Sequence, residues 1–184
     1  MRGCRMKRIA LMLLIGVLLL GCSNKQNNQS QQSQSDQNNN SVIKNEEIIY
    51  KSDQYGFEFL LPDSWKGYTI IDDTWEGFAA GETKSQKIIE TGPLISIRHP
   101  KWSSEEPRQD IPIMVFTLSQ WDSLRKEQFH IGAAPIGPSE IDKNSKYVFA
   151  LPARYNFSFP EGYQEVEDIL NNKPLKPTEN FKAQ

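Results

Sequence analysis

The sequence predicts an α+β fold, in one globular domain of about 130 residues, within a chain of 184 residues. All 19 aromatic residues lie between Tyr50 and Phe181, and all 11 prolines lie between Pro62 and Pro177. Short segments with apolar side chains at every second position, typical of antiparallel strands, accompany two segments of helical period. This mixture predicts a central antiparallel sheet with helices packed on it.

The first part of the domain contains the clearest strand pattern. Residues 48–50 form a short apolar run, and residues 55–61 carry aromatic or leucine side chains at alternate positions. That alternation predicts a strand with one buried face. A turn is expected at 62–64, and residues 68–71 and 94–97 predict two further strands.

The middle of the domain is expected to change from loop to strand to helix. Residues 100–110 contain two prolines and several charges, which predicts a loop. Residues 111–117 predict a strand, with Pro112 near its start, where a missing backbone donor matters least. Ser119 and Asp122 resemble a capping box, which predicts a helix from residue 119 to about residue 128.

The last part of the domain predicts a hairpin and a second helix. Residues 136–141 and 147–151 are the expected strands of the hairpin, with a turn at 142–145. Residues 162–171 carry apolar side chains on one helical face and acids on the other, so this helix should pack on the sheet. The domain is expected to span residues 45–172, and residues 173–184 are expected to fray.

The N-terminus has the features of a bacterial export signal. Residues 1–8 contain four basic side chains and no acid. Ile9–Leu20 is an apolar run too short to span a bilayer, which needs about 20 apolar residues. The run ends in Leu19-Leu20-Gly21-Cys22, which resembles the lipobox of bacterial lipoproteins. The resemblance implies removal of residues 1–21 as a signal peptide and a diacylglycerol anchor on Cys22, and hence a cell-membrane location on the extracytoplasmic face. An uncleaved signal anchor, or an ordinary secretory peptide with an incidental cysteine, is the alternative.

The segment after Cys22 predicts a flexible tether. Of the 19 residues from Ser23 to Ser41, 17 are Ser, Asn or Gln. Such side chains cannot bury apolar area, so nothing offsets the entropy of ordering them. Residues 22–44 are therefore expected to hold the domain at a distance from the membrane.

Charge and composition disfavour several classes of function. Without the signal peptide the chain keeps 17 basic and 23 acidic residues, a net charge near −6. An acidic chain without a basic run is a poor match for nucleic acid. The only cysteines are Cys4 and Cys22, and the only histidines are His99 and His130. Together with the lack of recognised catalytic motifs, this predicts no metal site, no cofactor and no catalytic residue.

Residues 55–67 carry a second resemblance. The segment reads Tyr-Gly-Phe, an apolar strand, then Pro-x-x-Trp, and is similar to the opening of PsbP/Mog1-type domains. That family implies an α/β/α sandwich around a central antiparallel sheet, and mostly non-catalytic binding or assembly modules. The whole chain also resembles Firmicutes-type lipoproteins, which combine a polar leash with one small domain.

One constellation is a candidate binding site. Arg98, His99 and Trp102 follow a predicted strand, where a loop is displayed by a rigid scaffold. An indole flanked by cations could recognise a sugar ring or an acyl surface. In the competing interpretation, Trp102 folds back over the core and the charges face water. Arg154 is expected to pair with an acid of the last predicted helix.

Two clusters of carboxylates support an alternative function. Residues 72, 73 and 76 are acidic, as are residues 105, 106 and 110, and either cluster could supply paired acids or a weak cation site. The leading hypothesis is a membrane-tethered, non-enzymatic binding or assembly module whose partner is an envelope protein or a cell-wall component. The alternative is a small envelope hydrolase that uses paired carboxylates. A solute receptor is disfavoured, because one domain cannot build two lobes around a cleft.

Overall fold

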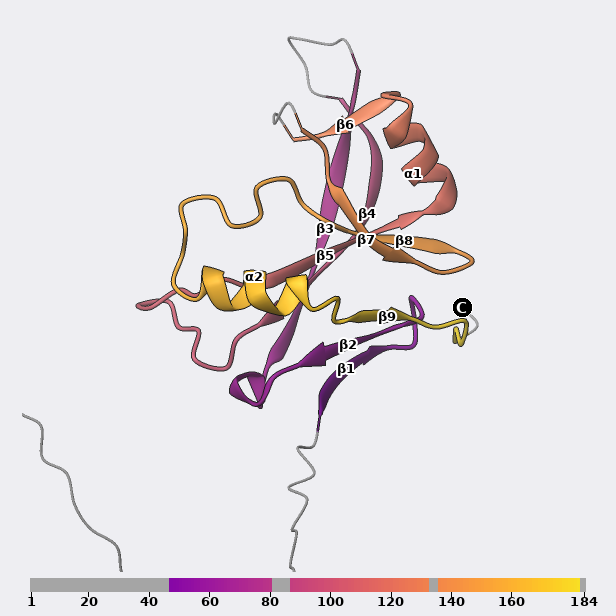
Figure 1. Cartoon of the computed structure of the whole chain (residues 1–184). Helices are drawn as coiled ribbons and strands as arrows, with labels where there is room; N and C mark the ends of the chain where they lie inside the picture. Colours follow the sequence, from indigo (N-terminus) through magenta and orange to yellow (C-terminus); the bar gives the residue numbers. More distant parts are fainter. Residues whose placement is uncertain (1–46, 81–86, 133–135, 183–184) are drawn as a thin grey trace, which may run out of the picture. The chain divides into compact units, whose positions relative to one another are not determined.

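The computed structural model describes residues 47–80, 87–132 and 136–182 (Figure 1). These residues form nine strands, two α-helices and one short 3-10 helix, and every strand pairing is antiparallel, which establishes an α+β fold. Within these ranges, neither helix is long and apolar enough to cross a membrane. The expected signal peptide, Cys22 and the tether lie outside the described residues.

The strands form two sheets, with three strands in the order β1-β2-β9 and six in the order β6-β3-β4-β5-β8-β7. The elements, in chain order, are β1 (Ile48–Ser52), β2 (Phe57–Leu61), η1 (Asp63–Trp65), β3 (Thr69–Ala79), β4 (Ile88–Arg98), β5 (Ile111–Thr117), α1 (Leu118–Arg125), β6 (Phe129–Ile131), β7 (Ser139–Lys143), β8 (Tyr147–Leu151), α2 (Tyr163–Asn171) and β9 (Leu175–Pro177).

The strand β2 confirms the predicted alternation. Phe57, Phe59 and Leu61 are buried, whereas Glu58 and Leu60 between them are half-exposed. The Phe57 ring lies 4.8 Å from the Phe149 ring of β8, measured between ring centroids. The small sheet therefore packs its apolar face against the large sheet.

The strand β5 is buried on both faces. Ile111, Ile113 and Val115 belong to the core that β2 and α2 also enter. Met114 and Phe116 point to the other face, where they join a second core that includes Trp121 of α1. One face of the large sheet is thus covered by α2 and the small sheet, and the other is covered by α1 (Figure 1).

The hairpin of β3 and β4 is longer than the sequence predicts. Only residues 68–71 and 94–97 were expected to be strands, yet the pairing runs from Thr69↔Arg98 to Phe78↔Ile88. The indole of Trp75 lies across Gly92, where a Cβ atom would come within 2.5 Å of the ring, and Nε1 donates to the Val115 carbonyl oxygen at 2.9 Å. This contact holds the far half of the hairpin to β5. That half was not predicted, because the polar residues around Trp75 interrupt the alternation of apolar side chains.

The helix α1 starts from a different capping box from the one predicted. The Thr117 hydroxyl accepts from the Gln120 backbone N–H, and the Gln120 side chain accepts from the Thr117 N–H. The box expected at Ser119 and Asp122 is therefore wrong by two residues. The helix ends at Arg125, and Glu127, at φ 56°, turns the chain into β6, a strand that the sequence did not predict.

The hairpin of β7 and β8 is confirmed, although β7 covers residues 139–143 instead of 136–141. Asn144 organises its turn by accepting from the backbone N–H groups of Lys146 and Tyr147. The same side chain donates to the carbonyl oxygens of Tyr55 and Gly56. It thereby ties this turn to the turn between β1 and β2.

The C-terminal segment does not fray at residue 173 as expected. Residues 175–177 form β9 on the edge of β2, and Leu175 is buried in the main core. The Lys182 backbone N–H donates to the Asp53 carbonyl oxygen at 3.0 Å. The prediction failed because β9 is only three residues long, follows Pro174 and ends in Pro177, which leaves no alternation to detect.

A pair of substitutions on β2 tests its burial. Phe57→Ala removes a ring that is 1% exposed and should lower the free energy of unfolding by about 3–5 kcal/mol. Glu58→Ala should cost far less, because Glu58 contacts Lys51 at the surface. Urea unfolding of both variants measures the difference, and equal losses would contradict the assigned faces.

Candidate functional site

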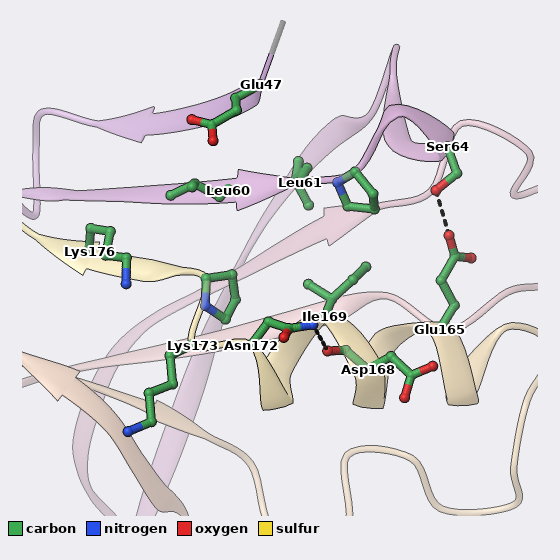
Figure 2. Close-up of a pocket in the computed structure, with 12 residues that line it drawn as sticks. Glu47, Leu60, Leu61, Ser64, Glu165, Asp168, Ile169, Asn172, Lys173 and Lys176 are labelled. Carbon is green, nitrogen blue, oxygen red and sulfur yellow. Dashed lines mark hydrogen bonds between the residues drawn. The ribbon is translucent and has the colours of Figure 1, made fainter. Parts of the chain in front are cut away.

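A groove of about 730 Å³ runs between the end of β2 and α2 (Figure 2). It is lined by apolar and charged side chains of β2, α2 and the segments beside them. These residues are Glu47, Leu60, Leu61, Pro62, Ser64, Glu165, Asp168, Ile169, Asn172, Lys173, Pro174 and Lys176.

The groove exists because β9 is shorter than β2. The strand β9 pairs only with residues 57–59, so Leu60 and Leu61 extend beyond it. The chain leaves α2 through Pro174, whose carbonyl oxygen accepts from the Leu60 N–H at 3.1 Å. Past this bond α2 and β2 diverge, and the space between them remains open.

The groove has an apolar floor and a rim of separated charges. Leu61 and Ile169 form the deepest part, where they join the main core, and Leu60 is half-exposed above them. Figure 2 shows the carboxylates of Glu165 and Asp168 at one end, the side chains of Lys173 and Lys176 at the other, and the carboxylate of Glu47 above Leu60. An amphipathic segment with a charge at each end would complement this surface.

Behind the acidic end of the groove lies a polar cluster. The Ser64 hydroxyl donates to Glu165 Oε1 at 2.6 Å, as drawn in Figure 2. Glu165 Oε2 lies 4.0 Å from His99 Nε2 and 3.9 Å from Arg108 Nη2. Arg108 also contacts Glu161 at 3.3 Å. The cluster thus connects the start of α2 to η1 and to the loop between β4 and β5.

His99 is an internal part of this cluster. Its side chain is 4% exposed, its ring meets the Trp65 ring edge-on at 5.0 Å, and Nδ1 accepts from the Lys101 N–H. Burial lowers the pKa of His99 below its ordinary value, and the neighbouring Arg108 cation lowers it further, against the opposite effect of Glu165. The neutral imidazole is therefore the form that the fold favours.

The structure brings Arg98 and Trp102 together and buries His99 apart from them. Arg98 makes a bidentate ion pair with Asp110, and its guanidinium lies 3.9 Å from the centre of the Trp102 ring. His99 faces the interior instead. The half-buried Trp102 ring is thus covered on one face by Arg98, and it is not among the residues that pack on either core.

The other predicted polar residues are also dispersed. Asp110 pairs with Arg98, and the acids at 72, 73 and 76 are exposed along β3. Arg154 does not pair with any acid of α2; Arg108 does. In the described ranges, no group of three or more His, Cys, Asp or Glu side chains could hold a metal ion.

Comparison of this chain with protein-family models, with curated proteins and with solved structures found no match.

Sequence reasoning missed the groove and β9, although it predicted β2 and α2, the two elements on either side of the groove. The amphipathic pattern of residues 162–171 predicted α2, and the alternation of residues 55–61 predicted β2. The groove residues Leu60, Glu165 and Asp168 occupy positions that these patterns leave facing away from the core. No local motif marks them, because the site depends on how far β9 extends along β2.

The burial of His99 predicts a pH dependence of stability. The pKa of His99 is lower in the folded chain than in the unfolded one, so the neutral side chain stabilises the fold. This contribution to the free energy of unfolding is fully present above the unfolded pKa of about 6.5 and is lost as pH falls through the folded pKa. Urea unfolding should therefore give a lower free energy at about pH 5 than at about pH 7. His99→Gln should reduce this dependence, whereas His130→Gln, at a half-exposed position, is the matched control. An unchanged pH slope in His99→Gln would contradict the assignment.

Proposed function

We propose that this chain is a lipid-anchored protein of the bacterial cell envelope, whose domain is a non-enzymatic module that binds a partner in the groove between β2 and α2. The anchor is argued from the basic n-region, the twelve-residue apolar run and the Leu19–Cys22 lipobox. Two acyl chains on Cys22 would hold the protein stably at the membrane.

The observation that carries the binding function is the lining of the groove. An apolar floor excludes water from a bound side chain, and charged groups at both ends fix its direction. Leu60 is half-exposed in the groove, so a bound ligand would remove apolar surface from water. The partner best suited is an extended segment of an envelope protein or of a cell-wall peptide.

The geometry of the described carboxylates gives less support to the alternative function, a hydrolase that uses paired carboxylates. Such an enzyme needs two carboxyl groups that flank one bond. Asp110 is committed to Arg98, and successive strand residues such as Asp72 and Asp73 point to opposite faces.

We also propose that the fold is of the PsbP/Mog1 type. The residues that carry this resemblance form β2 and η1, with Trp65 1% exposed. Helices α1 and α2 contribute to cores on opposite faces of the large antiparallel sheet, in keeping with an α/β/α arrangement.

The lipid anchor is tested at its attachment residue. Cys22→Ala removes the only thiol available at the lipobox, so labelled palmitate should no longer be incorporated and the protein should leave the membrane fraction. Cys4→Ala is the matched control and should leave both unchanged. Equal labelling of the Cys22→Ala variant and the unaltered chain would refute the proposal.

The groove is tested by photo-crosslinking in native membranes. A photoreactive residue at Leu60 should crosslink one partner, because this side chain lines the groove. The same residue at Ile71, which is 37% exposed and lies outside the groove, is the matched control. Lys173→Glu with Lys176→Glu should weaken the crosslink from Leu60 by reversing the charge at one end. The same product from both positions, or none from Leu60, would refute binding in the groove.

A further inference from the structure

Two phenylalanines project from the loop that joins β8 to α2. The side chains of Phe157 and Phe159 are 74% and 69% exposed, the largest values among the exposed large hydrophobic residues of the described ranges. Exposing two such rings to water is unfavourable, and exposed apolar side chains close together in one loop often mark an interaction surface.

The loop is held in this form by specific contacts. The Asn156 side chain donates to the Glu167 carboxylate of α2 at 2.6 Å. The Gln109 side chain donates to the Tyr155 carbonyl oxygen, and the Gln109 backbone N–H donates to the Glu161 carbonyl oxygen. The backbone adopts left-handed conformations at Ser158 and Phe159, with φ of 73° and 49°. The rings are therefore displayed by an ordered turn whose ends are fixed.

The charges of the loop favour a negatively charged surface. Residues 152–160 contain one cation, the exposed Arg154, and no acid, although the chain as a whole is acidic. The nearest acid in sequence, Glu161, is 72% exposed, and the charge of its carboxylate is balanced by Arg108 at 3.3 Å. A convex apolar tip beside a cation suits insertion into the headgroup region of an anionic bilayer.

The tether keeps this loop close to a membrane. The described chain begins at Glu47, and Glu47 and Glu165 both line the groove. Glu165 lies two residues after Tyr163, whose ring packs on the Phe159 ring with the two ring centroids 5.0 Å apart. A flexible tether of the 26 residues from Cys22 to Glu47 would have a root-mean-square span of about 25–30 Å. This span is comparable to the size of the domain, so anchoring raises the local concentration of membrane surface and makes a weak contact effective.

We propose that the loop of residues 154–160 is a second membrane contact, in which Phe157 and Phe159 enter the interface of an anionic lipid bilayer and Arg154 meets lipid phosphate. This inference rests on the proposed lipid anchor at Cys22. It implies that the domain lies against the bilayer in a fixed orientation.

The test is the depth of a spin label in the lipid-anchored protein. Ser158→Cys supplies a free thiol between the two rings, because Cys4 is removed with the signal peptide and Cys22 carries the lipid. In vesicles containing phosphatidylglycerol, a nitroxide at residue 158 should collide more with oxygen than with a water-soluble nickel complex. Gln128→Cys, exposed just before β6 at the other end of the large sheet, is the matched control and should show the reverse.

Two double variants separate lipid from other partners. Phe157→Ser with Phe159→Ser should move the label at residue 158 to the aqueous value, whereas Leu at both positions should keep it in the bilayer. Loss of contact in the Leu pair would overturn the proposal in favour of a partner that needs aromatic faces. An aqueous label in the unaltered loop, or dipolar broadening from a second copy, would also overturn it. Unchanged urea unfolding shows that the variants fold.

A second measurement separates this inference from the proposed function. The mature chain with Cys22→Ser, which cannot be lipidated, should bind the same vesicles, and each Phe→Ser change should weaken this binding about tenfold. If palmitate labelling shows no lipid on Cys22 and this chain still binds, the anchor fails and the loop contact stands. If Cys22 is lipidated and neither the label nor the vesicles detect the loop, only the loop contact fails.

Discussion

Burial of β5 on both faces is the constraint on which the rest of the structure depends. Its residues alternate between two cores, with Ile113 in one and Met114 in the other, so each face of the strand needs its own cover. The segment that follows, α1, covers one face, and the small sheet with α2 covers the other. Both covers are required, because a strand left open on one side would expose its apolar residues to water.

Two polar contacts make this arrangement specific. The Trp75 indole crosses Gly92 to reach the Val115 carbonyl oxygen, which fixes how the long hairpin lies on β5. Asn144 binds the backbone of Tyr55 and Gly56, which fixes the small sheet relative to the hairpin of β7 and β8. Each side chain donates hydrogen bonds to backbone carbonyl oxygens of an element far away in sequence. These bonds fix the position of one element relative to the other.

The same architecture separates structural charges from surfaces that are free to bind. Arg98 is used by Asp110 and Trp102, and Arg108 is used by two glutamates around the start of α2. The apolar groove beside β2 and the aromatic loop before α2 remain exposed. We propose a separate role for each surface: the groove would bind a partner, and the loop would orient the domain on the membrane.

The sequence alone determined the elements whose side chains repeat with a regular period. The alternation around Phe57 predicted β2, and the amphipathic pattern around Val166 predicted α2, because burial of one face requires that spacing. Prolines marked the loop before β5 for a similarly local reason. The lipobox at Cys22 is also a purely local pattern, and the anchor that it predicts stands as a proposal.

Only the tertiary structure decided the features that depend on distant partners. Leu175 forms β9 because β2 offers it an edge, and a three-residue strand that follows one proline and ends in another carries no pattern of its own. His99 follows a strand like many surface residues, yet it is buried because Trp65 and Glu165 meet around it. The groove likewise reflects where one strand ends along another, a distance set by packing between segments more than a hundred residues apart and by no residue type alone.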